Sequence, residues 1–117
     1  MDITTLVDTW FECWRNGNYQ DLPLAEDFSH SSPFGTITGK KAYLELVAAN
    51  PDKFLGTTIT LLDRLEGSHS ACVRYHLGQE DFQMEVSEWI YAKDGLVRSI
   101  HAYYHIGEIK EDRVLDT

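Results

Sequence analysis

The sequence is poor in cysteine, in basic residues and in long apolar runs, and each shortage argues against a class of protein. Its two cysteines, Cys13 and Cys72, lack CxxC spacing, so we expect reduced thiols without a metal or a disulfide. Lys and Arg number 10 against 19 Asp and Glu, and the resulting net charge of -9 repels phosphate backbones and anionic membrane surfaces. The sequence therefore predicts a protein that binds neither nucleic acid nor membranes.

The opening residues, MDITTLVDTWFECW, carry three acidic side chains among the apolar ones and no basic cluster. This pattern is typical of neither a secretion signal nor a membrane span, so we expect a cytoplasmic protein. A chain of 117 residues with 43% hydrophobic and 25% charged residues suits one globular domain with its own core. We predict a single domain over residues 1–107 and a polar tail over residues 108–117.

Helical periodicity dominates the first half of the chain. Apolar residues recur at spacings of three and four from Ile3 to Trp14, which predicts an amphipathic helix with one core-facing stripe. The expected elements are this helix, ending before Gly17, then a short helix or turn from Tyr19, a strand over residues 28–34 and a second helix between Gly39 and Asn50.

The apolar period changes to two in the second half. Short Gly-containing connections between the alternating stretches predict an antiparallel meander. Its four strands are expected over residues 57–66, 70–77, 81–92 and 96–106, with turns at Gly67-Ser68, Gly78-Gln79 and Asp94-Gly95.

The apolar pattern of the last hairpin also predicts its register. A three-residue loop, 93–95, pairs Ala92 with Leu96 and puts the apolar residues of both strands on one face. In this register Glu88 lies on the core face, and Arg98 points inward on a diagonal from it.

Three charged residues are then expected to meet at one edge of the sheet. Asp63 shares its face with apolar residues of the first meander strand, and the meander would bring Asp63, Glu88 and Arg98 together. Glu88 is the strongest catalytic candidate, because an unpaired carboxylate on an apolar face has a raised pKa suited to proton transfer. Two interpretations stay open: Glu88 acts as an acid and base, or it forms a structural ion pair with Arg98.

The order of elements resembles the NTF2-like superfamily, in particular its SnoaL-like and ketosteroid-isomerase-like branch. The resemblance covers about residues 3–107 and includes the local patterns RNGNY, SPFG, G-x-x-A-Y and KDGLV. It implies an α+β conical barrel in which a curved sheet wraps around the helices and encloses a pocket. It also implies dimers through the outer face of the sheet, and the fold serves enzymes and non-enzymes alike.

The resemblance can be carried over at three positions. The general base of ketosteroid isomerases precedes the Pro-x-Gly corner and corresponds here to Ser32, whose hydroxyl is no base at neutral pH without an activating partner. The donor tyrosine of the first helix corresponds to Trp10, and the neutral acid falls close to Glu88. Limonene-epoxide-hydrolase-like relatives use an Arg flanked by two acids, which Asp63, Glu88 and Arg98 supply at other positions. SnoaL-like cyclases need little more than one acidic residue in an apolar pocket.

We therefore predict a pocket for a small, mostly apolar ligand, without an organic cofactor or a metal. His101 and His105 share a strand face but lie about 13 Å apart, too far to hold one ion. The protein is then either an isomerase, cyclase or hydrolase that uses Glu88 without a cofactor, or a non-catalytic ligand-binding or dimerisation module. The expected lining residues are Trp10, His30, Ser32, Tyr43, Tyr75 and Tyr104.

The outer face of the predicted sheet combines aromatic residues with Arg and few lysines, a composition typical of protein interfaces. We therefore predict a homodimer through this face rather than a face covered only by solvent. Its residues are expected to be Arg74, His76, Trp89, Tyr91, His101, Tyr103 and His105.

Overall fold

The computed structural model describes residues 1–107, 110–113 and 115. Its elements, in chain order, are α1 (Ile3–Asn16), the 3₁₀ helix η1 (Tyr19–Asp21), β1 (Leu24–Ser32), β2 (Gly35–Thr38), α2 (Lys40–Ala49), α3 (Pro51–Phe54), β3 (Thr58–Glu66), β4 (Ser70–Gln79), β5 (Phe82–Lys93), β6 (Leu96–Tyr103) and the 3₁₀ helix η2 (Glu111–Arg113). Half of the predicted tail, residues 108–109, 114 and 116–117, lies outside the described residues.

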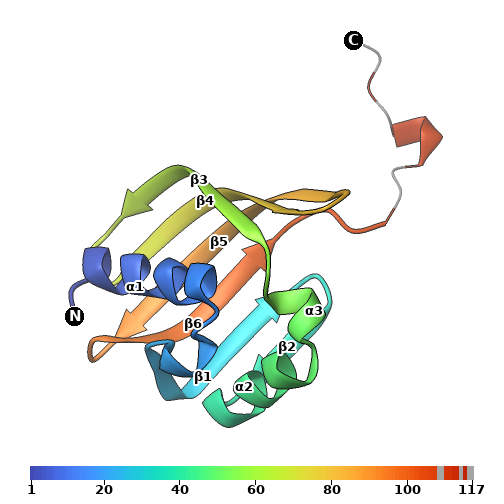
Figure 1. Cartoon of the computed structure of the whole chain (residues 1–117). Helices are drawn as coiled ribbons and strands as arrows, with labels where there is room; N and C mark the ends of the chain where they lie inside the picture. Colours follow the sequence, from blue (N-terminus) through green and yellow to red (C-terminus); the bar gives the residue numbers. More distant parts are fainter. Residues whose placement is uncertain (108–109, 114, 116–117) are drawn as a thin grey trace.

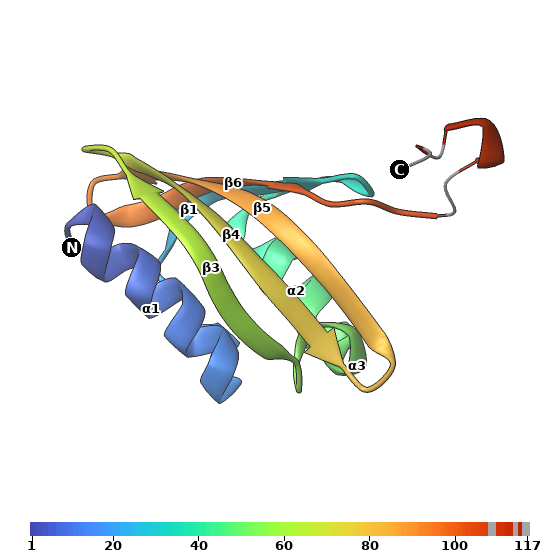
Figure 2. The same cartoon turned by 90° about the horizontal axis from the view of Figure 1, so that it is seen from above.

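The strands form one mixed sheet in the order β2-β1-β6-β5-β4-β3 (Figure 1). Strands β3 to β6 form the predicted antiparallel meander, and β1 joins β6 in parallel. All three α-helices lie on one side of this curved sheet, as Figure 2 shows. The predicted α+β architecture, a curved sheet wrapped around helices, is confirmed. No helix in the described ranges has the length and hydrophobicity to cross a bilayer.

The sequence around α1 contains clear start and stop signals. The carboxylate of Asp2 accepts a hydrogen bond from the backbone N–H of Thr5 at 2.8 Å, which caps the first turn. Gly17 ends the helix with a positive φ of 73°, a conformation that glycine adopts without a Cβ penalty. The predicted apolar stripe is buried against the sheet, with Leu6 and Val7 fully inaccessible to solvent.

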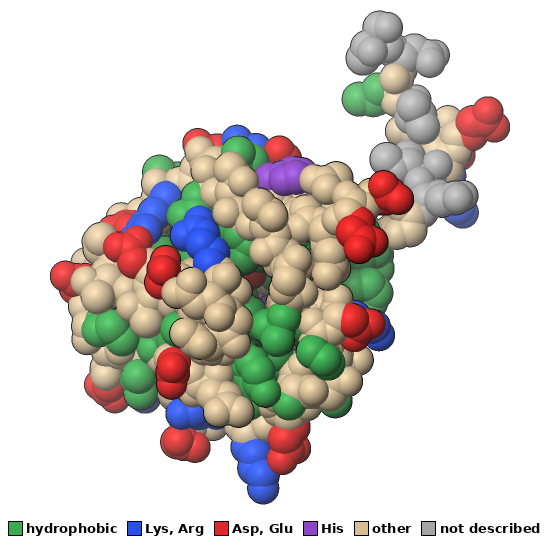
Figure 3. Space-filling model, viewed as in Figure 1, with side chains coloured by type: hydrophobic (Ala, Val, Ile, Leu, Met, Phe, Trp, Pro, Cys, Tyr) green, Lys and Arg blue, Asp and Glu red, His purple; other side chains and the backbone are tan. Residues whose placement is uncertain are grey.

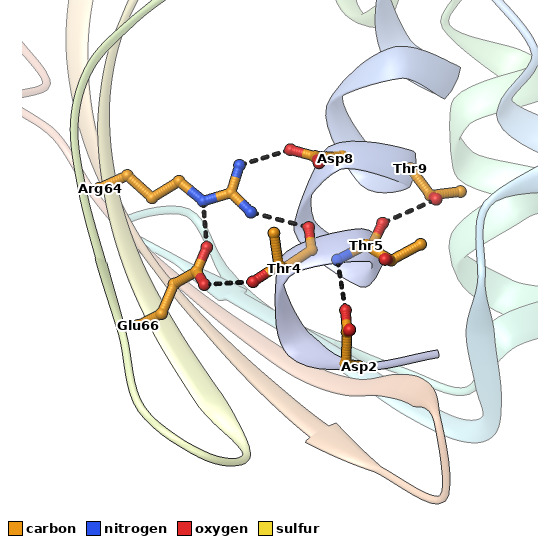
Figure 4. A network of polar contacts seen from close by, with 7 residues as sticks. All are labelled: Asp2, Thr4, Thr5, Asp8, Thr9, Arg64 and Glu66. Carbon is orange, nitrogen blue, oxygen red and sulfur yellow. Dashed lines mark hydrogen bonds and ion pairs between the residues drawn. The ribbon is translucent and has the colours of Figure 1, made fainter.

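A polar network fastens the first turns of α1 to β3 (Figure 4). The guanidinium of Arg64 donates to the carboxylates of Asp8 and Glu66 and, at 2.7 Å, to the backbone carbonyl of Thr4. The Thr4 hydroxyl donates to Glu66 at 2.6 Å. Because Arg64 satisfies acceptors on both elements, this network fixes where α1 lies on the sheet.

A β-bulge in β3 overturns the prediction that Asp63 faces inward. Leu61 pairs with Tyr75 and Asp63 pairs with Arg74, so Leu62 is an extra residue that reverses the inward and outward alternation beyond it. Asp63 therefore lies exposed on the outer face, where its carboxylate pairs with Arg74.

A second bulge, in β6, overturns the predicted register of the last hairpin. The turn is a two-residue Asp94-Gly95 turn with Lys93 opposite Leu96, and both turn residues have positive φ, 54° and 76°. Such turns match the right-handed twist of the strands, which favours them over the predicted three-residue loop. Tyr91 pairs with Ser99, but Ala92 pairs with Val97, so Arg98 is the extra residue. Arg98 consequently points outward.

Two local predictions also differ from the structure. The SPFG corner is a hairpin turn, because residues 35–38 form the unpredicted strand β2 and pair back onto β1. The turn between β4 and β5 lies at residues 80–81 rather than at 78–79, and Gly78 continues β4 opposite Gln83. A Cβ at Gly78 would lie 2.8 Å from the Gln83 side chain, so this glycine serves close packing instead of a turn.

Candidate active site

A cavity of about 320 Å³ lies between the helices and the concave face of the sheet. Aromatic and aliphatic side chains form most of its wall, which suits a small apolar ligand. Five of the six predicted ligand-binding residues, Trp10, His30, Tyr43, Tyr75 and Tyr104, line it together with Glu88.

Glu88 is a buried charged residue at the wall of this cavity. Its side chain is only 3% exposed, between the inward-facing Val86 and Ile90 of β5. The indole Nε1–H of Trp10 donates to its Oε1 at 2.9 Å, and the hydroxyl of Tyr75 donates to its Oε2 at 2.9 Å. Burial raises the pKa of Glu88 to about 7, although both hydrogen bonds act in the opposite direction. At neutral pH the carboxyl is therefore present in both protonation states.

The two donors to Glu88 are themselves held by the core. Trp10 packs edge-on against Trp14, with ring centroids 5.7 Å apart, and Tyr75 packs edge-on against Phe11 at 5.2 Å. Burial, together with the charge of Glu88, raises the pKa of Tyr75 well above its usual value. Tyr75 consequently keeps its proton and remains a donor at any physiological pH.

His30 reaches the cavity from β1 on the opposite side. Its ring stacks on Tyr43, with centroids 5.2 Å apart and an interplanar angle of 24°. Burial and, to a smaller extent, the nearby His101 lower the pKa of His30 to about 4, so the imidazole is neutral at pH 7. The hydroxyl of Tyr43 is also buried, which raises its pKa.

Three predicted site residues lie elsewhere. Ser32 is not among the lining residues, and its hydroxyl accepts a hydrogen bond from the backbone N–H of Phe34 at 3.2 Å within the corner. Asp63 and Arg98 lie on the outer face, Arg98 beside a shallow hollow that His101 also lines. The sheet therefore separates Arg98 from Glu88, and the predicted Asp63–Glu88–Arg98 cluster does not exist.

The structure adds lining residues that the sequence patterns did not suggest. Lys53 and Phe54 of α3 close one side of the cavity, and Trp14 and Phe34 contribute further aromatic rings. The second helix ends before Asn50, as predicted, but Pro51 directly after it begins the unpredicted single-turn helix α3. Proline at that position is common, because the first helical N–H has no partner in the helix.

Metal ligands are not grouped in the part of the chain that the structure describes, where no three His, Cys, Asp or Glu side chains could hold an ion. Cys13 and Cys72 are free thiols. Acidic side chains are scattered over the face shown in Figure 3, with Lys and Arg among them.

Solved structures with the same fold include proteins of several provisional functions. A provisionally named ketosteroid isomerase from Kribbella flavida DSM 17836 is 21% identical with a TM-score of 0.76, over 97% of this chain and 87% of that one. A provisionally named polyketide cyclase from Xanthomonas campestris pv. campestris is 18% identical with a TM-score of 0.70, over 87% and 89%. An LEH-like epoxide hydrolase from M. tuberculosis is 14% identical with a TM-score of 0.72, over 86% and 80%.

These identities establish a common fold and no common activity. No curated protein matches the sequence significantly. The model of the SnoaL-like domain family, however, matches residues 7–114, almost the whole chain. The protein therefore belongs to the SnoaL-like domain family.

Proposed function

We propose that the protein binds a small, mostly apolar ligand in the cavity and that Glu88 transfers a proton on this ligand without a cofactor, in an isomerase- or cyclase-type reaction. The observation that carries the proposal is a buried carboxyl, with its pKa raised to about 7, at the wall of an aromatic cavity. A general acid and base works best when its pKa lies near the working pH. Two of the structural relatives, provisionally named as an isomerase and a cyclase, support the same reaction class.

The chemistry requires a ligand with an acidic C–H bond next to a carbonyl group. The Glu88 carboxylate takes the proton, the C–H electron pair moves into the carbon framework, and negative charge develops on the carbonyl oxygen. The protonated Glu88 then returns the proton to another carbon. Trp10 and Tyr75 each hold one carboxyl oxygen, at 2.9 Å, and so fix the position of Glu88 throughout.

Replacing Glu88 with Gln tests this proposal, because the amide keeps the shape of the side chain and removes the base. We expect the wild type to accelerate exchange of the α-protons of 2-tetralone in D₂O, followed by proton NMR, and the variant to lose about 100-fold of that rate. Glu45→Gln, an exposed change on α2, serves as the matched control and should keep the rate.

Exchange by Glu88→Gln at the wild-type rate would contradict the proposal. Binding of 2-tetralone by the wild type without any exchange would instead favour a non-catalytic ligand-binding module. In that module the Glu88 carboxyl would be stabilised by the hydrogen bonds from Trp10 and Tyr75 without an ion pair to Arg98, because Arg98 lies on the other face of the sheet.

We also propose that the outer face of the sheet forms a homodimer. The helices leave this face uncovered, and Trp89, Tyr91 and Tyr103 on it are 45%, 40% and 59% exposed. Exposed aromatic rings of this size are typical of interface cores. Sedimentation velocity should give twice the chain mass of 13.4 kDa for the wild type and one chain mass for Trp89→Glu. A monomeric wild type at high concentration would contradict a dimer.

A further inference from the structure

His30 supplies a polar side chain to the cavity wall that Glu88 does not use. Within the described ranges no hydrogen bond joins its imidazole to another residue, and the ring instead stacks on Tyr43. Because Tyr43 covers one ring face, the ring edge with its nitrogens is the polar part that is left for a ligand.

The protonation of His30 decides which kind of polar group it can bind. Burial keeps the ring neutral at pH 7, and a neutral imidazole has one N–H only. The second ring nitrogen is therefore an acceptor without a hydrogen atom.

The sheet register places His30 and Glu88 on opposite sides of β6. His30 pairs with Ile100 of β6, and Glu88 pairs with Ala102 two residues farther along. One strand between them and an offset of two residues separate their Cα atoms by about 12 Å. Ala102 lies in this gap and lines the cavity with a single methyl group, so the gap leaves room for a small ligand that meets both side chains.

We propose that His30 selects ligands that carry a hydroxyl group, whose O–H donates to the free ring nitrogen while the rest of the molecule extends over Ala102 toward Glu88. This inference rests on the proposed function as far as ligand binding in the cavity is concerned. The ligand class is a mostly apolar molecule with a phenolic or enolic hydroxyl at one end.

A matched pair of probes tests the selection. 2-Naphthol and 2-methoxynaphthalene share the ring system, but only the first has an O–H to donate. Isothermal titration of the full chain at about pH 7 should show the wild type binding 2-naphthol about tenfold more tightly, the value of one hydrogen bond. His30→Phe keeps the stack on Tyr43 and should bind both probes with nearly equal affinity.

Two controls separate His30 from other acceptors. His69→Phe, an exposed change in the β3–β4 turn, should keep the preference for 2-naphthol. Glu88→Gln should also keep it, because the hydroxyl contacts His30. As an independent readout, 2-naphthol should move the ¹⁵N resonance of the unprotonated His30 nitrogen upfield in the wild type, and 2-methoxynaphthalene should leave it in place.

A preference that persists in His30→Phe, or that disappears only in Glu88→Gln, would overturn the inference and leave proton transfer by Glu88 untouched. A tenfold preference in a wild type that does not exchange 2-tetralone would support the inference and contradict the catalytic proposal. Failure of the wild type to bind 2-naphthol would overturn the inference and leave the catalytic proposal to the 2-tetralone exchange.

Discussion

Trp10→Ala should lower the free energy of unfolding by about 4 kcal/mol, within the range measured for truncation of large aromatic residues in cores. Trp10 is 2% exposed and packs against Trp14 and Phe28, with ring centroids at 5.7 and 6.3 Å. The truncation therefore opens a large void beside the cavity and also removes the donor to Glu88 Oε1. Urea unfolding followed by circular dichroism measures the loss.

Trp10→Phe separates the packing contribution of Trp10 from its hydrogen bond. The phenyl ring fills much of the space but has no N–H for Glu88, which costs about 1–3 kcal/mol at a charged acceptor. Because the carboxylate needs this donor more than the neutral acid does, the loss should grow as the pH rises through the Glu88 pKa of about 7. A loss that is the same at acidic and alkaline pH would show that the Trp10–Glu88 hydrogen bond contributes little.

Glu88→Gln should change the pH dependence of stability by about 3 kcal/mol. In the folded chain the pKa of Glu88 is raised from 4.5 to about 7, so the folded state binds the proton more tightly than the unfolded state. The wild type therefore loses stability as the pH rises from about 4.5 to 7, and Gln, which does not titrate, removes this loss. The free energy of unfolding of the variant, minus that of the wild type, should therefore increase between about pH 4 and pH 8.

His30 acts in the opposite direction over nearly the same range. Its pKa is lowered from 6.5 to about 4, so protonation favours the unfolded chain and stability falls as the pH drops through that interval. In the wild type the two contributions to stability oppose each other. In Glu88→Gln only the His30 contribution remains, so this variant should lose stability as the pH falls. Urea unfolding at about pH 4, 6 and 8 checks this, with the double variant Glu88→Gln, His30→Phe as the control that lacks both contributions. A pH-independent difference between Glu88→Gln and the wild type would contradict the raised pKa.

Period-two patterns predicted the inward position of Glu88 correctly, because its neighbours Val86 and Ile90 are apolar and buried. The same rule failed for Asp63 and Arg98, since each follows or forms a β-bulge. A bulge adds one residue to a strand, and the apolar Leu65, which is exposed on the outer face, continues the alternation of a strand without a bulge and so hides the extra residue Leu62. Beyond that bulge the inward-facing residue is Arg64. It is charged and donates a hydrogen bond to Asp8 of α1, so the inward position is not marked by an apolar residue.

The cavity was predictable from the sequence only in part. Trp10, Tyr43 and Tyr75 were expected to line it because their elements present them to the core, and they do. Phe54 was missed because α3 is a single turn behind a proline, too short to show a helical period. The burial that raises the pKa of Glu88 depends on three elements packing together, which no local pattern contains.

The parallel pairing of β1 with β6 has a consequence for how the chain folds. The strand at the middle of the sheet is the one synthesised last, so β1 and β2 have no partner in the meander until residue 103 has been made. Their contacts close a loop of most of the chain, and such long-range pairings slow folding. During synthesis the open edges of β1 and β5 are exposed, and these edges are where misfolding and aggregation would begin.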